Sequence, residues 1–141
     1  MSAAFKAETA ALLGRFFAAY NYRDIDGILE TMGDDVVLEA NQSRQFNGKA
    51  ELRAFMFERF YHYRETLSDM RTLVSDTGYF AAAEYTISGT YQVTADGMPD
   101  ANGQQFQLRA GCFFEIDDEQ ISRLSPHFNL VEMHRQLMRN S

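Results

Sequence analysis

The chain has 141 residues, of which 45% are hydrophobic, and its formal net charge is −7. Its length and composition are typical of one globular domain, spanning residues 1–141, and the acidic balance argues against nucleic-acid binding. The single cysteine, Cys112, excludes an intrachain disulfide bond and a metal site built from several thiolates. No stretch approaches the roughly 20 apolar residues of a membrane span, and no signal peptide is evident, so we expect a cytoplasmic protein without a membrane partner.

Three segments of the first half of the chain carry apolar residues at helical spacing. They cover residues 3–20, 25–32 and 48–63. Asp24 is a candidate cap for the second of these helices, and Gly33 is expected to end it. Between the second and third helices, a strand begins at Val36 and a bend follows it.

The second half of the chain changes to a period of two, which is typical of strands. Strands are predicted over residues 65–75, 79–93, 105–116 and 120–128. The loop over 94–104 is rich in turn residues, and a closing helix begins at Leu130. Consecutive strands joined by tight turns favour an antiparallel sheet. We therefore expect an α+β fold, with a curved, mainly antiparallel sheet around three N-terminal helices and a short C-terminal helix.

The alternation also predicts two faces for the strand over 105–116. Its even-numbered residues, including Cys112, form an apolar face on which the thiol would be buried and inert. Phe113 and, on the preceding strand, Tyr85 are placed among polar residues on the outer face, where two copies of the chain could pair. Arg109 is expected to pair with a glutamate on a neighbouring strand or to bind an acid group of a ligand.

Several motifs, taken in this order, resemble one protein family. They are DDVVLEANQ (34–42), YRE (63–65), GTY (89–91), NGQ (102–104), AGCFFEI (110–116) and HFNL (127–130). The chain resembles the SnoaL-like, or ketosteroid-isomerase-related, proteins of the nuclear transport factor 2-like superfamily over residues 8–138. The resemblance implies a cone-shaped fold around an apolar pocket, a small apolar or polyketide- or steroid-like ligand, no cofactor, and a homodimer through the sheet face.

The catalytic acids of these families are replaced in this chain. The position of the proton-shuttling carboxylate of the isomerases corresponds to Ala40, and their two oxyanion-binding residues correspond to Phe16 and Leu108. In those isomerases a neutral carboxylic acid donates a hydrogen bond to the oxyanion, and that chemistry is not expected here. The acid of the SnoaL-like cyclases corresponds to Asn129, and an amide does not shuttle protons near neutral pH.

Three residues remain as candidates for chemistry in the expected pocket. Glu39 would take or give the proton, His127 would assist, and Asn129 would hold a carbonyl oxygen. Other roles stay open for each, namely a solvent-facing Glu39, a rim position for His127, and a turn or helix cap at Asn129. The residues expected to contact the ligand are Phe16, Tyr20, Asn41, Tyr63, Leu108 and Phe128.

The function that follows is proton transfer beside the carbonyl group of a small apolar compound. The reaction would be an isomerisation, a cyclisation or a dehydration, and it would need no cofactor and no metal ion. Three scattered histidines give no spacing for a metal site. The alternatives are a binding module without catalysis and an interaction protein that pairs through its sheet.

Overall fold

The computed structural model describes residues 2–139. Four helices and six strands follow one another along the chain. They are α1 (Ser2–Asn21), α2 (Ile25–Glu30), β1 (Met32–Glu39), β2 (Gln45–Asn47), α3 (Gly48–His62), β3 (Tyr63–Val74), β4 (Phe80–Tyr91), β5 (Gln105–Asp117), β6 (Gln120–His127) and α4 (Leu130–Arg139).

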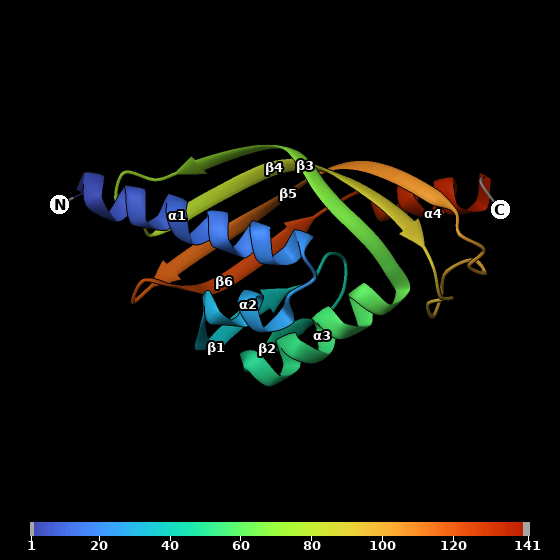
Figure 1. Ribbon diagram of the computed structural model, residues 1–141, viewed down its shortest axis with the longest axis horizontal. Coiled ribbons are helices and arrows are strands. Elements are labelled where there is room, and N and C mark those ends of the chain that lie inside the picture. Colours follow the sequence, from blue (N-terminus) through green and yellow to red (C-terminus); the bar gives the residue numbers. More distant parts are fainter. Residues whose placement is uncertain (1, 140–141) are drawn as a thin grey trace.

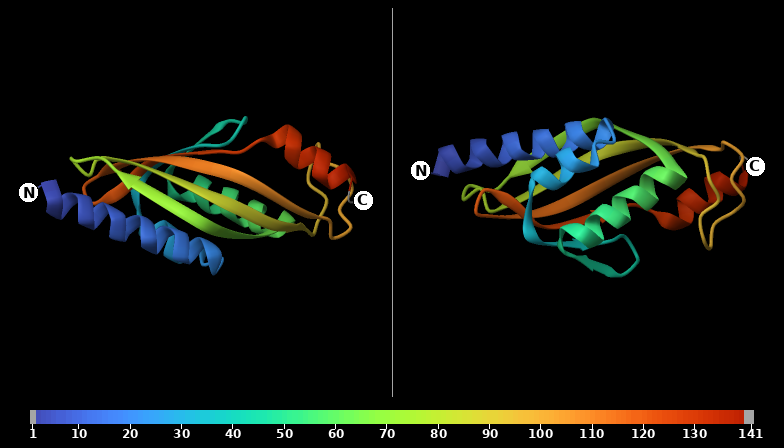
Figure 2. Two further views of the ribbon diagram at one scale, coloured as in Figure 1. Left: turned by 90° about the horizontal axis from the view of Figure 1, so that it is seen from above. Right: turned by 60° about the horizontal axis from the view of Figure 1, so that its bottom comes forward.

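All six strands form a single sheet in the order β2-β1-β6-β5-β4-β3. Every neighbouring pair is antiparallel except β1 and β6, which run parallel. The sheet is strongly curved; α1, α2 and α3 lie on one side of it, and α4 lies at its far end (Figures 1 and 2). The predicted α+β fold, with a curved and mainly antiparallel sheet, is confirmed. Within the described residues, no helix is long and apolar enough to cross a membrane.

The largest departures from the predicted elements lie at the boundary between α2 and β1 and at β2. The second helix ends at Glu30 rather than near residue 32, because Met32 already pairs with Ile121 of β6. The backbone N–H of Ile121 also donates to the carbonyl of Thr31, at 2.9 Å. The three-residue strand β2 was not predicted, and it forms because it pairs with the end of β1. In both places a partner that is distant in the sequence outweighs the local pattern.

The core lies between the helices and the concave face of the sheet. On β5 the even-numbered residues from Phe106 to Ile116 are buried, as the alternation predicts. Phe114 packs edge to face against Phe16 and Phe17 of α1, with ring centroids 5.6 Å and 5.8 Å apart. Such large, well-packed aromatic residues carry much of the apolar burial that stabilises a small domain.

The convex face carries charged and polar side chains together with exposed aromatic rings. Arg109 forms an ion pair with Glu84, at 2.8 Å, so the predicted pairing with a glutamate on a neighbouring strand is confirmed. Phe113 is exposed on this face, as predicted. The prediction for Tyr85 is wrong, because Tyr85 lies directly opposite Ala110 in the β4–β5 pairing and therefore shares its buried, concave face.

Candidate functional site

A cavity of about 250 Å³ lies between the helices and the concave face of the sheet. Phe16 and Phe17 of α1 and Met56 of α3 form part of its walls from the helical side. Ile87 of β4 and Leu124 of β6 face them from the sheet. These positions follow from the sequence pattern, since helical spacing on α1 and α3 and alternation on the strands turn apolar side chains to the same interior.

Three polar side chains form a hydrogen-bonded cluster in this apolar surrounding. Glu65, which is only 2% exposed, accepts from Arg59 Nε at 3.0 Å and from Arg59 Nη2 at 2.6 Å. The hydroxyl of Tyr20 also donates to Glu65, at 3.0 Å. Arg59 comes from the last turn of α3, and Glu65 from the start of β3, so the α3–β3 junction brings this pair together. The guanidinium also lies over the ring of Tyr63, 4.3 Å from its centroid.

Burial and charge fix the protonation states in this cluster. Burial raises the pKa of Tyr20 well above its ordinary value, and the Glu65 carboxylate raises it further. Burial on its own would lower the pKa of Arg59, but the Glu65 carboxylate offsets this and leaves that pKa raised. Arg59 is therefore a cation and Tyr20 a neutral hydroxyl donor at any physiological pH. The pair of charges cancels, so the cluster has no net charge.

Two donors at the cavity have capacity left for a ligand. Tyr85 is buried and lines the cavity, and its hydroxyl has no hydrogen-bond partner among residues 2–139. Arg59 uses Nε and Nη2 on Glu65, while its Nη1 has no partner in that same range. Burial raises the pKa of Tyr85, which keeps its hydroxyl protonated. The carboxylate of Glu65, in contrast, already accepts three hydrogen bonds. The free hydrogen-bonding capacity here therefore suits a ligand oxygen that accepts.

Four of the six residues expected to contact a ligand line this cavity. They are Phe16, Tyr20, Asn41 and Phe128. Asn41 also accepts from the backbone N–H of Phe128 at 3.2 Å, which holds the β1–β2 loop against the segment after β6. Tyr63 lies beneath Arg59 and stacks on Tyr91, and Leu108 is buried in the core, so neither belongs to the cavity lining.

The structure does not bring Glu39, His127 and Asn129 to the cavity. Glu39 forms an ion pair with Arg123, and His127 contacts Ser125 at 3.0 Å, both on the convex face. This placement follows from alternation, because Leu38 and Pro126, their neighbours in the chain, line the cavity on the other face.

Asn129 occupies the cap position of α4. Its side-chain oxygen accepts from the backbone N–H of Glu132 at 2.9 Å, and its backbone carbonyl accepts from the N–H of Met133 at 3.0 Å. This is the bonding pattern of a helix N-cap. The cap role that the sequence left open for Asn129 is therefore the one that the hydrogen bonds show.

Sequence reasoning missed Arg59, Glu65 and Tyr85. Glu65 did carry a signal, because it stands between Tyr63 and Leu67 on the buried face of β3, where an acidic residue is unusual.

Cys112 also lines the cavity, and burial raises its pKa to about 12, in keeping with the expected inert thiol. No group of three or more potential metal-ligating side chains occurs in the described part of the chain.

Comparisons with known proteins place this architecture in a family. Residues 13–124 match the family model of the SnoaL-like domain. A candidate polyketide cyclase from Xanthomonas campestris pv. campestris is 34% identical, with a TM-score of 0.92 over 94% of this chain and 98% of that one. Another, from Pseudomonas putida KT2440, is 36% identical, with a TM-score of 0.88 over 89% of this chain and 95% of that one.

A more distant structural relative shows a likeness in fold alone. An LEH-like epoxide hydrolase from M. tuberculosis is 18% identical, with a TM-score of 0.75 over 96% of this chain and 92% of that one. No curated protein matches the chain. Proteins named for different reactions therefore share this architecture, and fold alone does not decide between them. The family model and these relatives above 30% identity show that this chain belongs to the SnoaL-like family, with the nuclear transport factor 2-like fold.

Proposed function

We propose that this chain binds a small, neutral, apolar compound in its cavity and transfers a proton beside a carbonyl group of that compound. The reaction would be an isomerisation, a cyclisation or a dehydration. The observation that carries the proposal is the buried Tyr20–Glu65–Arg59 cluster in an otherwise apolar cavity, next to the partnerless hydroxyl of Tyr85. Two of the relatives above 30% identity are named as candidate polyketide cyclases, and these names support the same class of ligand.

The size of the cavity limits the ligand. Its volume of about 250 Å³ lies just below the usual range for ligand pockets, about 300–1,000 Å³. A compound of one or two rings suits this volume better than a four-ring steroid. The apolar walls would hold its carbon skeleton, and Tyr85 and Arg59 would donate to its oxygen.

The same donors would stabilise a reaction intermediate. When a proton leaves the carbon beside a carbonyl, negative charge moves to the carbonyl oxygen, and fixed donors in a dry site stabilise that charge strongly. Glu65 is the only carboxylate among the residues that line the cavity, so we assign the proton transfer to it rather than to Glu39. Tyr20 and Arg59 would position the carboxylate.

One observation favours binding without catalysis as the second candidate. The Glu65 carboxylate already accepts three hydrogen bonds from Tyr20 and Arg59, which hold it in the cluster and away from a ligand. In this case the cluster would shape the polar end of a binding site. Incubation with a metabolite extract, followed by mass spectrometry, separates the two candidates. Turnover that is lost in Glu65→Gln supports catalysis, whereas retention of a compound without turnover supports binding alone.

A matched pair of probes tests the binding site itself. We expect 2-naphthol to bind more tightly than naphthalene, because only 2-naphthol offers an oxygen to Tyr85. One hydrogen bond contributes about 0.5–1.5 kcal/mol, so the preference should be up to about tenfold. Tyr85→Phe should remove this preference in a fluorescence titration.

The control for this titration is Tyr79→Phe, which makes the same chemical change at a tyrosine outside the cavity lining. It should leave both affinities unchanged. If Tyr85→Phe still binds 2-naphthol more tightly than naphthalene by the same factor, the hydroxyl of Tyr85 does not bind the ligand oxygen.

We also propose that two copies of the chain pair through the convex face of the sheet. Phe113 and Phe80 are 56% and 57% exposed there, and both border a hollow that also contains Glu39, Arg123 and His127. Exposed aromatic residues beside charged groups are common at protein interfaces. The cytoplasmic location expected from the sequence stays a prediction.

A further inference from the structure

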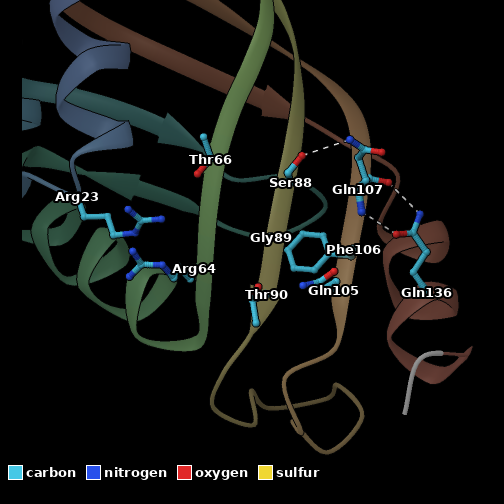
Figure 3. A pocket seen from close by; sticks show the side chains of 10 residues that line it. All are labelled: Arg23, Arg64, Thr66, Ser88, Gly89, Thr90, Gln105, Phe106, Gln107 and Gln136. Atoms are coloured by element: carbon cyan, nitrogen blue, oxygen red, sulfur yellow. Dashed lines mark hydrogen bonds between the residues drawn. The ribbon is translucent and has the colours of Figure 1, made fainter.

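A second hollow lies on the convex face of the sheet, away from the apolar cavity. It has a volume of about 570 Å³ and spans β3, β4 and β5 at the end of the sheet near α4 (Figure 3). The cavity residues Glu65 and Leu67 belong to the opposite face of β3, because side chains alternate along a strand. The groove and the apolar cavity share no lining residue.

The strand register arranges the floor of the groove in two rows of polar side chains. One row runs from Arg64 through Thr90 to Gln105, and the other from Thr66 through Ser88 to Gln107. Side chains directly opposite one another on neighbouring strands lie within contact distance. In the second row, Gln107 donates to the hydroxyl of Ser88 at 3.3 Å, as Figure 3 shows. The rows thus present hydroxyl and amide groups at regular intervals.

Side chains from outside the sheet close both ends of the groove. On the β3 side, Arg23 donates through Nη2 to the backbone carbonyl of Glu65 at 2.8 Å and through Nη1 to that of Asn21 at 3.2 Å. On the β5 side, the amide of Gln136 accepts from the backbone N–H of Gln107 at 2.8 Å and donates to its carbonyl at 2.9 Å. These backbone contacts fix both end residues in place.

The arginine end of the groove carries positive charge that no carboxylate neutralises. Neither Arg23 nor Arg64 forms an ion pair with any residue in the described range 2–139. Six other arginines of the chain do form ion pairs with carboxylates. They are Arg44, Arg53, Arg59, Arg109, Arg123 and Arg135.

Both guanidinium groups also have donors to spare. Figure 3 shows Arg23 and Arg64 together at one end of the groove. A guanidinium has more N–H donors than the two that Arg23 spends on backbone carbonyls. In a chain with a net charge of −7, two adjacent arginines without acidic partners leave a local positive charge.

We propose that this groove binds a sugar phosphate, with the phosphate group on Arg23 and Arg64 and the sugar along the two rows. Guanidinium groups match the geometry of phosphate oxygens and bind them with charge-assisted hydrogen bonds. The hydroxyls of Thr66, Ser88 and Thr90 and the neighbouring amides donate and accept, as the hydroxyl groups of a sugar require. The volume of about 570 Å³ is larger than a lone phosphate needs and lies within the range of small-molecule sites.

Titration with glucose 6-phosphate, followed by the backbone amide signals in nuclear magnetic resonance, tests this proposal. We expect the amides of residues 64–66, 88–90 and 105–107 to shift together. Arg64 is exposed, so Arg64→Gln should fold normally and weaken binding about tenfold, the loss of one charge-assisted interaction. Glucose without phosphate should not shift these signals, and inorganic phosphate should bind more weakly than the sugar phosphate.

The control variant is Arg71→Gln, which removes an exposed arginine from the same strand outside the groove. Its affinity for glucose 6-phosphate should stay within about twofold of that of the unmodified chain, because weak screened charges act little at a distance. Equal losses in both variants, or the absence of shifts at the three segments, would overturn the proposal. Inorganic phosphate that binds as tightly as the sugar phosphate would overturn the assignment to a sugar.

Discussion

The ion pair between Arg59 and Glu65 is the most buried pair of charges in the cavity, and its two halves depend on each other. Glu65→Leu leaves the guanidinium in an apolar surrounding without its carboxylate. Removing one partner of a buried pair costs about 3–5 kcal/mol, and we expect a loss of this size in the free energy of unfolding. Urea denaturation, monitored by circular dichroism, measures it.

The double variant Arg59→Met with Glu65→Leu provides the comparison. Well-packed apolar residues often replace a buried ion pair without loss, so the double variant should be more stable than Glu65→Leu alone. A double variant that loses the sum of both single losses would contradict this and show that the two charges act independently.

The sequence reveals the apolar part of the site better than its polar part. Phe16 and Phe128 are predictable, because periodicity alone turns them toward the interior. The contact between Arg59 and Glu65 depends on the junction of α3 and β3. The sequence pattern predicts where this junction lies but not how the two side chains are oriented across it. Tyr85 needs the register between β4 and β5, and a shift by one residue would turn its side chain to the other face.

At the scale of one element, the cap of α4 gives a direct test of the role of Asn129. Its side chain bonds to the backbone N–H of Glu132, so Asn129→Ala should cost about 1 kcal/mol in the free energy of unfolding. Asn129→Asp should retain most of the stability, because a carboxylate also caps a helix and suits its N-terminus.

The same two variants show whether Asn129 also serves the cavity. The affinity for 2-naphthol should stay within about twofold of the unmodified value in both, because Asn129 does not line the cavity. If Asn129→Ala instead loses more binding free energy for 2-naphthol than free energy of unfolding, this would support the ligand-holding role expected from the sequence.

Most helices and strands are predictable from local patterns, and the exceptions have a common cause. The long strands β4 and β5 alternate between more and less buried residues along their whole length. The strand β2 has only three residues, which is too few to show alternation, and it exists through its pairing with β1. The parallel pairing of β1 with β6 likewise joins two strands that lie far apart in the chain, so local sequence patterns do not predict it.

In the whole molecule, the two faces of the sheet have separate chemistry. The concave face encloses the cavity with its neutral Tyr20–Glu65–Arg59 cluster. The convex face carries the arginine-ended groove near α4 and, over β1, β6, β5 and β4, the hollow bordered by Phe80 and Phe113. Since alternation assigns each side chain to one face, a substitution on one face should leave the other largely unchanged.

The proposed dimer tests this separation, because its interface lies on the convex face alone. The chain has a mass of 16.1 kDa, and sedimentation velocity should give twice this value for the unmodified protein. Phe113→Asp should produce the monomer. A twofold interface contains each residue twice, so the substitution places two carboxylates in it, and burying an unpaired charge is costly.

Phe57→Asp is the matched control for this measurement, because Phe57 is 61% exposed on α3 and lies off the convex face. We expect it to remain dimeric, and we expect both variants to bind 2-naphthol as the unmodified chain does, since neither residue lines the cavity. A monomeric unmodified chain would refute pairing through this face. Loss of the dimer in Phe57→Asp with retention in Phe113→Asp would instead place the interface on the helical side of the sheet.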